Sequence, residues 1–349
     1  MTDRRKSFGS DNHAGAHPDV LRALSAAGAG DATSYGDDPV TRQAAARLCE
    51  LSGAAEAYFV FNGTGANVFG LSLMLRPFQA VICPASSHLY EDECGAAERI
   101  IGSKLLTVAT PDGKLTPELI ASRLGDRGDE HRSQPHAVAI AQVTEFGTCY
   151  SPGELMAISG FCRDQGLLLF IDGARLANAA AHLNCGIADI AAHADVLTFG
   201  GTKNGAIVAE AVLVMNPALA AEAPFQRKQL MQLASKMRFV AAQFAALLDG
   251  DLWLRNARHA NAMAARLAKA VAVLPEVELA QPVQGNAVFA ILASQPAVRL
   301  QATWNFGIYG GQPGGRSLVR WMAAFDTGPE DVDAFAADIA AVTAASQTE

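Results

Sequence analysis

One stretch, residues 167–204, constrains the fold of this chain more than any other. It reads LLLFIDGARLANAAAHLNCGIADIAAHADVLTFGGTKN. The apolar run from Leu167 to Ile171 predicts a buried strand, which ends in Asp172-Gly173. A second apolar run, Val196 to Phe199, predicts a strand that ends in Gly200-Gly201-Thr202-Lys203. Because a helix-length segment separates the two runs, we expect a strand–helix–strand unit.

The residues that follow these two strands, Asp172 and Lys203, suggest a cofactor site. A lysine can carry pyridoxal phosphate as a Schiff base, and an acid can pair with the protonated pyridine nitrogen so that the ring accepts electrons. Each residue alone has a simpler explanation. An Asp after a strand is often a helix N-cap, and a Lys after Gly-Gly-Thr is often a solvated loop residue. The pair favours a functional site, and the rest of the chain has to supply its other parts.

Length and charge exclude several classes of protein. The chain has 349 residues, half of them hydrophobic, which is enough for one large domain and a smaller one. A net charge of −8 argues against a nucleic acid or an anionic membrane as partner. No apolar run of about 18 residues occurs, so no membrane span is expected. The amino end, MTDRRKSFGSDN, has no apolar core, so no secretory signal is expected.

The cysteines indicate a reducing compartment. The chain has six, scattered and without a CxxC pair. We expect reduced thiols in a cytoplasmic protein, with no disulfide framework, no zinc site and no other metal.

A strand-to-helix turn at residues 57–67 is a candidate phosphate site. The apolar strand from Ala57 to Asn62 runs into Gly63-Thr64-Gly65, and a helix follows. Glycines there leave backbone N–H groups free to hold an anion at the positive end of the helix. The turn is neither a Walker loop nor a GxGxxG loop. Glycine at such a turn is also common for backbone reasons alone.

Two more strand ends carry polar side chains. His88 lies just past the strand Ala80 to Cys83, where its flat ring can stack on an aromatic cofactor, although a loop histidine is more often solvated or structural. Glu145 follows the strand Ala137 to Val143. The cluster at residues 91–93, Glu-Asp-Glu, is expected to be a solvated helix start.

Strands that alternate with helices, with candidate chemistry at successive strand ends, predict a doubly wound α/β sheet. Ligands of such sheets lie outside the carboxyl ends of the strands. We expect an N-terminal segment near the site (residues 1–17), a large cofactor-binding domain (18–250) and a small C-terminal domain (251–349). One long helical segment is expected at 225–248, and a helix from Leu252 to Leu274 is expected to cross into the small domain.

Arg320 and Tyr35 are candidates with open alternatives. In the predicted strand SLVRWM, Arg320 shares a face with Leu318 and Met322, so it is expected to pair with an anion such as a carboxylate. Tyr35 lies on a turn-rich loop, where it either belongs to an ordinary turn or lines a site. Arg238, near the middle of the long helical segment, is expected either to bind a phosphate or to lie on a solvated face.

Several motifs occur together in the order and spacing of a known family: Tyr-Gly-Asp-Asp-Pro (35–39), Gly-Thr-Gly-Ala-Asn (63–67), His88, Asp-Gly-Ala-Arg (172–175), Thr-Lys (202–203), Met-Arg (237–238) and Arg320. With them the chain resembles the low-specificity L-threonine aldolases, from about Ser10 to its carboxyl end. These are pyridoxal-phosphate enzymes of the aspartate-aminotransferase fold (fold type I). The resemblance implies a large domain with a mostly parallel doubly wound sheet and a smaller α+β C-terminal domain.

The resemblance also implies roles for individual residues. Lys203 would bind the cofactor covalently beside Thr202, Asp172 would hold the pyridine nitrogen, and His88 would stack on the ring. The phosphate would be held by Gly63, Thr64, Gly65 and Arg238, the last of these from this or a neighbouring subunit. The substrate carboxylate would be oriented by Ser10, Arg175 and Arg320. Tyr35 would reach across a subunit interface into the site of the neighbouring subunit.

The implied activity is retro-aldol cleavage of L-threonine, L-allo-threonine or related L-β-hydroxy amino acids, such as phenylserine, to glycine and an aldehyde. The implied assembly is a homotetramer built from dimers with shared active sites. Some family members have a histidine where this chain carries Glu145, which leaves Glu145, His88 and a water as candidates for the general base. The alternative functions are a β-eliminating lyase or aminotransferase on the same fold, and a non-catalytic pyridoxal-phosphate-binding protein.

Overall fold

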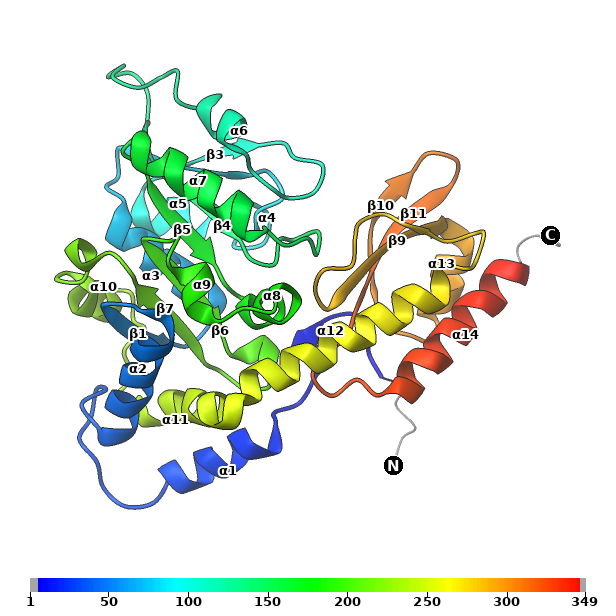
Figure 1. The fold of residues 1–349 in the computed structure, drawn as a ribbon, viewed down its shortest axis with the longest axis horizontal. Helices are drawn as coiled ribbons and strands as arrows, with labels where there is room; N and C mark the ends of the chain where they lie inside the picture. The colour runs from blue at the N-terminus through cyan, green and yellow to red at the C-terminus, as the bar shows by residue number, and fades with distance from the viewer. Residues whose placement is uncertain (1–5, 346–349) are drawn as a thin grey trace.

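The computed structural model describes residues 6–345, which form two β-sheets joined by helices (Figure 1). The strands of the large sheet are β1 (Glu56–Val60), β2 (Gln79–Pro84), β3 (Lys104–Val108), β4 (Gln134–Ala141), β5 (Leu168–Asp172), β6 (Val196–Gly200) and β7 (Glu210–Val214). Those of the small sheet are β8 (Glu278–Leu279), β9 (Ala287–Ala293), β10 (Gly307–Gln312) and β11 (Arg316–Met322).

The large sheet is mostly parallel, with strand order β1-β7-β6-β5-β4-β2-β3. Within it, β7 runs antiparallel to both of its neighbours, β1 and β6. The pairs formed by β2, β3, β4, β5 and β6 are parallel, so the carboxyl ends of these strands meet at one edge. The expected doubly wound sheet is therefore confirmed. Strand β3 was not foreseen from the sequence.

Helices cover both faces of this sheet and one face of the small one. They are α1 (Pro18–Ala27), α2 (Pro39–Ser52), α3 (Gly63–Met74), α4 (His88–Glu91), α5 (Ala96–Ile101), α6 (Pro117–Ala121), α7 (Pro152–Asp164), α8 (Leu176–Leu183), α9 (Ile187–Ala191), α10 (Ala223–Gln229), α11 (Arg238–Leu248), α12 (Leu252–Val271), α13 (Ser294–Gln301) and α14 (Pro329–Ala345). One apolar core lies between the sheet and α3 and α5, and a larger core lies on the side of α2, α7, α8 and α11. No helix within residues 6–345 is long and apolar enough to cross a membrane.

Local sequence signals explain several helix boundaries. Helix α7 begins with a capping box, in which the Ser151 hydroxyl accepts the N–H of Glu154 and the Glu154 carboxylate accepts the N–H of Ser151. Helix α2 begins after Asp38, whose carboxylate accepts the N–H of Thr41 at 2.8 Å. In both helices a proline occupies the first turn, where its missing N–H is not needed.

The small sheet is antiparallel, with order β10-β11-β9-β8, and packs against α12, α13 and α14. Helix α12 runs from the large sheet to the small one (Figure 1). Its Trp253 is buried in the large core and its Leu267 in the small one. The N-terminal segment also belongs to the small core, because Phe8 stacks on Phe335 at 4.4 Å between ring centroids. Since α12 contributes to both cores, the domain boundary at residue 250 stays a prediction.

The expectation of one long helical segment at residues 225–248 is wrong. The segment forms two helices, α10 and α11, separated by residues 230–237. Met231 adopts a left-handed backbone conformation, with φ of 62°, which ends the helix. The next side chain, Gln232, turns inward and accepts the N–H of Phe61 at 3.1 Å. A contact between distant parts of the chain therefore overrides the helical pattern.

Candidate active site

The two strand ends singled out in the sequence lie against each other. The N–H of Gly173 donates to the Thr198 hydroxyl at 2.8 Å, and the N–H of Gly200 donates to the Gly173 carbonyl at 3.0 Å. A Cβ at Gly173 would overlap the Thr198 carbonyl oxygen, and one at Gly200 would overlap that of Ala174. Glycine is therefore needed where β5 and β6 end. This close approach places Asp172 and Lys203 at the same edge of the sheet.

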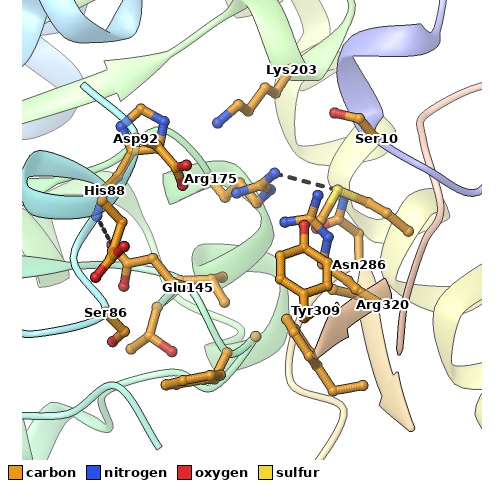
Figure 2. Close-up of a pocket in the computed structure, with 18 of the residues that line it drawn as sticks. Ser10, Ser86, His88, Asp92, Glu145, Arg175, Lys203, Asn286, Tyr309 and Arg320 are labelled. Atoms are coloured by element: carbon orange, nitrogen blue, oxygen red, sulfur yellow. Dashed lines mark hydrogen bonds between the residues drawn. The ribbon is translucent and has the colours of Figure 1, made fainter. Parts of the chain in front are cut away.

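Asp172 and Lys203 line a small cavity of about 50 Å³, together with Gly63, Asn67, His88 and Arg175. It adjoins a larger cavity of about 560 Å³ that lies between the large sheet and β9, β10 and β11. Both cavities are lined by His88, Glu145, Arg175 and Lys203. Figure 2 shows the Lys203 amine entering this space, with His88 and Glu145 on one side and Arg320 and Tyr309 on another.

The Lys203 amine is set up to react as a neutral nucleophile. It lies in the short 3-10 turn Thr202–Asn204 that follows β6. The positive charge of Arg175 and, after it, burial lower the pKa of Lys203, although Asp11, Asp172 and Glu210 act in the opposite direction. A lower pKa leaves more of the amine unprotonated, which is the form that attacks a carbonyl.

Asp172 is held at both oxygens. Its Oδ1 accepts the N–H of Ala174 at 2.9 Å, and its Oδ2 accepts the Asn67 side-chain amide at 2.8 Å. The simpler explanation, a helix N-cap, does not apply, because α8 begins at Leu176 with Arg175 in the cap position. A buried carboxylate fixed in this way has its charge available to a cation placed in the small cavity.

The turn before α3 has the features of an anion site. Asn62 caps the helix by accepting the N–H of Gly65 at 2.7 Å. The N–H groups of Gly63 and Thr64 lie in the first turn, where a helix supplies no internal acceptor. A Cβ at Gly63 would meet open space, whereas one at Gly65 would overlap the Gln232 side chain. The open side of this turn therefore faces the small cavity through Gly63.

His88 and Glu145 are joined. The N–H of His88 donates to Glu145 Oε1 at 2.8 Å, and Glu145 Oε2 has no hydrogen-bond partner among residues 6–345. Burial raises the pKa of Glu145 to about 7. A hydrogen bond to the Glu93 carboxylate raises the pKa of His88. Glu145 therefore titrates where a general base is useful.

Arg175 forms a buried ion pair with Asp11. The Arg175 Nε lies 2.7 Å from Asp11 Oδ2, and its Nη2 lies 3.0 Å from Asp11 Oδ1. Asn286 donates a further hydrogen bond to Asp11 at 3.0 Å. Burial alone would raise the pKa of Asp11, but the charges of Arg175 and Lys203 leave that pKa below its usual value. Two of the three Arg175 nitrogens are thus already bound within the chain.

Replacing Asp11 with alanine should strongly destabilise the fold. It leaves the Arg175 guanidinium, which is 16% exposed, without its partner, at an expected cost of about 3–5 kcal/mol in free energy of unfolding. Urea unfolding measures this cost. Asp333→Ala is the matched control, because the bidentate Arg266–Asp333 pair is exposed and its loss should change the free energy of unfolding little. Equal losses in the two variants would contradict the prediction.

Of the two arginines that line the larger cavity, Arg320 has fewer of its N–H groups bound within the chain. Its Nη2 makes a long hydrogen bond of 3.3 Å to the Gly9 carbonyl, and its Nε is buried without a partner among the described residues. It packs over the Tyr309 ring, 4.8 Å from the centroid. Leu318, Arg320 and Met322 all line this cavity, which confirms the face alternation expected for the strand.

Aromatic and aliphatic side chains form one wall of the larger cavity. Phe289 lies between Phe146 and Tyr309, at centroid distances of 6.1 and 6.2 Å. Leu318 extends this wall. The wall is apolar and the cavity is large, so the space favours a ligand with an apolar group of some size.

The other predicted residues are placed differently. Ser10 lines the larger cavity, and the Thr202 hydroxyl accepts the N–H of Ala209, the residue before β7, at 3.2 Å. Tyr35 is half exposed and lies under Lys228, and Arg238 donates to the Gly30 carbonyl at 3.3 Å. Neither Tyr35 nor Arg238 lines the two cavities of this chain. Their roles across a subunit interface stay predictions.

The residues that hydrogen-bond to the predicted site side chains had no predicted role: Asp11, Asn67, Glu93 and Asn286. Asn67 gave a signal, because it is the one amide side chain in the apolar helix that follows the glycine turn. Glu93 gave none. It was expected to be solvated with its neighbours, yet it is buried while Glu91 and Asp92 are exposed. That expectation is wrong, because the chain turns Glu93 inward to meet His88 and Asn67.

Comparisons with known proteins agree with this geometry. Residues 7–295 match the family described as beta-eliminating lyase. The chain is 44% identical to low specificity L-threonine aldolases of Pseudomonas sp. (strain NCIMB 10558) and Pseudomonas aeruginosa, covering 99% of this chain and 100% of each relative. A Leishmania major threonine aldolase structure superposes with a TM-score of 0.92 at 32% identity, covering 97% of this chain and 99% of that one.

A Sphingomonas wittichii serine palmitoyltransferase structure, at 16% identity and a TM-score of 0.76, covers 100% of this chain and 92% of that chain and shares the fold. The full-length matches, the fold and the residues gathered at the carboxyl ends of β5 and β6 lead to one assignment. This chain belongs to the L-threonine aldolases of the beta-eliminating lyase family.

Proposed function

We propose that this chain is a pyridoxal-phosphate-dependent L-threonine aldolase. It cleaves L-threonine, L-allo-threonine or related L-β-hydroxy amino acids to glycine and an aldehyde. The observation that carries this proposal is the meeting of Lys203 and Asp172 in one cavity that opens towards Arg320. The names of the Pseudomonas and Leishmania relatives support the same activity.

The residues around the small cavity fit the cofactor. Lys203 would bind it covalently, with Thr202 positioning the lysine turn, and Asp172 would hold the pyridine nitrogen. His88 would lie against the ring, and the first turn of α3, Gly63 to Gly65, would hold the phosphate. When bound, the cofactor supplies an electron sink for the cleaved bond. Arg238 of a neighbouring subunit would complete the phosphate site.

The substrate carboxylate is assigned chiefly to Arg320, with Ser10 and Arg175 beside it. The support is that Arg320 lines the larger cavity and has one long hydrogen bond, from Nη2 to the Gly9 carbonyl, whereas Arg175 has two nitrogens bound to Asp11. A carboxylate fixed by a guanidinium has a defined orientation, and this orientation selects the bond to be cleaved. The apolar wall at Phe146 and Phe289 would receive the substrate side chain, which supports bulky substrates such as phenylserine.

Cleavage needs a base for the β-hydroxyl proton and a later donor to the α-carbon. As the carbon–carbon bond breaks, the hydroxyl proton passes to the base, the aldehyde leaves, and a proton returned to the α-carbon completes glycine. Glu145, His88 and a water remain the candidates for the base. The Lys203 amine, in its unprotonated form, would displace glycine at the end.

Replacing Glu145 with glutamine tests its role as base. A carboxyl with a pKa of about 7 is protonated and inactive as a base below that pH, so wild-type kcat/KM should rise with pH through about 7. In Glu145→Gln this rise should disappear, and kcat/KM should fall about 10²-fold. A pH profile of kcat/KM with L-threonine measures both. Glu50→Gln, at an exposed carboxylate on α2, is the control and should keep the wild-type profile. A Glu145→Gln enzyme that retains the rise would assign the base elsewhere.

The reaction itself is tested by its products. Incubation with L-threonine and with phenylserine should give glycine with acetaldehyde or benzaldehyde in equal amounts. A keto acid that retains the carbon skeleton of the substrate would instead indicate a β-eliminating lyase or an aminotransferase. Binding of pyridoxal phosphate with no turnover of either substrate would indicate a non-catalytic binding protein.

We also propose a homotetramer built from dimers that share active sites, in a cytoplasmic location. Two predicted site residues, Tyr35 and Arg238, lie away from the cavities of their own chain, which supports sharing. Light scattering measures the mass of the assembly. Activity regained on mixing inactive Lys203→Ala and Arg238→Ala subunits would demonstrate sharing. The six cysteines, all free thiols, fit a reducing compartment.

A further inference from the structure

The side-chain amide of Asn67 bridges two carboxylates. Its Nδ2 donates to Glu93 Oε1 at 2.8 Å and to Asp172 Oδ2 at 2.8 Å, which uses both of its hydrogens. Only the NH₂ end of an amide can face two acceptors, so the orientation of Asn67 is determined. Its Oδ1 is buried without a hydrogen-bond partner within residues 6–345. The position of Asn67 therefore satisfies the two carboxylates and leaves its own carbonyl oxygen without a donor among the described residues.

Glu93 joins this bridge to His88. The Glu93 Oε1 that accepts from Asn67 also lies 2.9 Å from His88 Nδ1. The Glu93 side chain is 0% exposed, and its Oε2 has no hydrogen-bond partner in the described part of the chain. A buried carboxylate is costly unless it is paired with a positive charge or with donors. His88 and Asn67 are the partners that make it tolerable.

The backbone is shaped to bring Glu93 inward. After α4 the chain turns through two successive left-handed residues, Cys94 with φ of 51° and Gly95 with φ of 67°. A left-handed conformation is unfavourable for a residue with a side chain such as Cys94. The N–H of Ala96 closes the turn on the Glu93 carbonyl at 2.9 Å. The strain at Cys94 is offset by contacts that Glu93 makes inside.

We propose that Glu93 is a positioning residue, which holds His88 and, through the Asn67 amide, Asp172 as one hydrogen-bonded unit around the cofactor ring. The contacts of this unit are independent of the proposed function, and only its purpose rests on that function. Glu93 Oε1 accepts a hydrogen bond from the Nδ1–H of His88, which leaves Nε2 of the same ring towards the cavity. Asn67 fixes the Asp172 oxygen that Ala174 does not hold.

The direct test is the titration of His88 in the holoenzyme and in the cofactor-free full chain, with histidine labelled with ¹³C and ¹⁵N. The His88 signal is identified by its loss in His88→Asn. The groups around this ring are Glu93, Glu145, Asp172 and Lys203. In Glu93→Gln, which keeps the shape and loses the charge, the pKa of His88 should fall by about one unit. Glu91→Gln removes an exposed charge from the same turn and should move this pKa much less.

A second variant separates the two halves of the unit. Asn67→Ala should leave the His88 titration near its wild-type position, because the His88–Glu93 bond remains. It should change the pH dependence of the cofactor absorbance in the holoenzyme, because Asp172 loses a partner. Glu93→Asp retains the charge, so the pKa of His88 should fall less in this variant than in Glu93→Gln. If Glu93 had only a structural role, its replacement would lower the melting temperature and leave these titrations unchanged.

The wild-type protein supplies a result that does not depend on any variant folding. The ¹⁵N shifts of neutral His88 should show the proton on Nδ1. A proton on Nε2, or an unchanged His88 pKa in folded Glu93→Gln, would overturn the proposal. The product assay is separate from these measurements. Failure of that assay would remove the proposed activity and leave the positioning contacts as measured.

Discussion

Replacing Lys203 with alanine should abolish activity and colour together. The variant lacks the amine that holds the cofactor covalently, so the visible absorbance of the bound cofactor should be lost. It also lacks the group that displaces the product. Loss of a nucleophile costs several powers of ten, and we expect kcat/KM for L-threonine to fall by at least about 10³-fold. Absorbance spectra and glycine release measure the two effects.

The control for this variant is Lys269→Ala, which removes an exposed lysine from α12. It should keep both the absorbance and the activity. The melting temperature of Lys203→Ala should show that the chain still folds, because a small side chain at this position opens space towards the cavity. An active or coloured Lys203→Ala enzyme would refute the assignment of the covalent site and the mechanism built on it.

Replacing Asp172 with asparagine should give the second largest effect. The change keeps the size of the side chain and removes the charge that would stabilise a protonated pyridine nitrogen. It also sets one amide against another, because Asn67 already directs its NH₂ group at this position. Losing a preorganised electrostatic contact in a buried site costs about 10³-fold in kcat. We expect the cofactor to stay covalently bound, with an altered absorbance spectrum.

A carboxylate at the end of another loop provides the control. Asp195, which precedes β6, accepts the N–H of Leu169 and the side-chain amide of Asn216, both at 2.8 Å. Asp195→Asn should lower the melting temperature, because it turns an acceptor into a donor, and should leave kcat/KM near the wild-type value. If both variants lose stability but neither loses activity, then Asp172 is a structural residue.

The order of strands and helices could be predicted because each element carries its own local signal. Leu167 to Ile171 is a run of apolar residues with a turn after it, and the structure has β5 at Leu168–Asp172. Ser151 and Glu154 form a capping box that local sequence encodes. The break at residues 230–237 was missed, because it depends on Gln232 reaching the N–H of Phe61, just past the end of β1 and far away in the sequence.

The cofactor-binding candidates could be predicted for a similar reason. In a parallel sheet the carboxyl ends of strands meet at one edge, so residues after successive strands are brought together whatever lies between them. This rule predicts that His88, Glu145, Asp172 and Lys203 lie around one space, and in the structure all four line the small cavity. It says nothing of residues that reach the site from a distant segment.

The amino-acid sequence by itself determined the doubly wound sheet, the family and the residues after the strand ends, because periodicity and motif order are properties of neighbouring residues. The tertiary structure alone decided that Asp11 occupies Arg175 and that Glu93 faces inward while Glu91 stays exposed. Asp11 and Arg175 are 164 residues apart in the sequence, so no local pattern records their contact. Side-chain partners of this kind depend on which surfaces pack together, and the folded chain settles that through burial and charge.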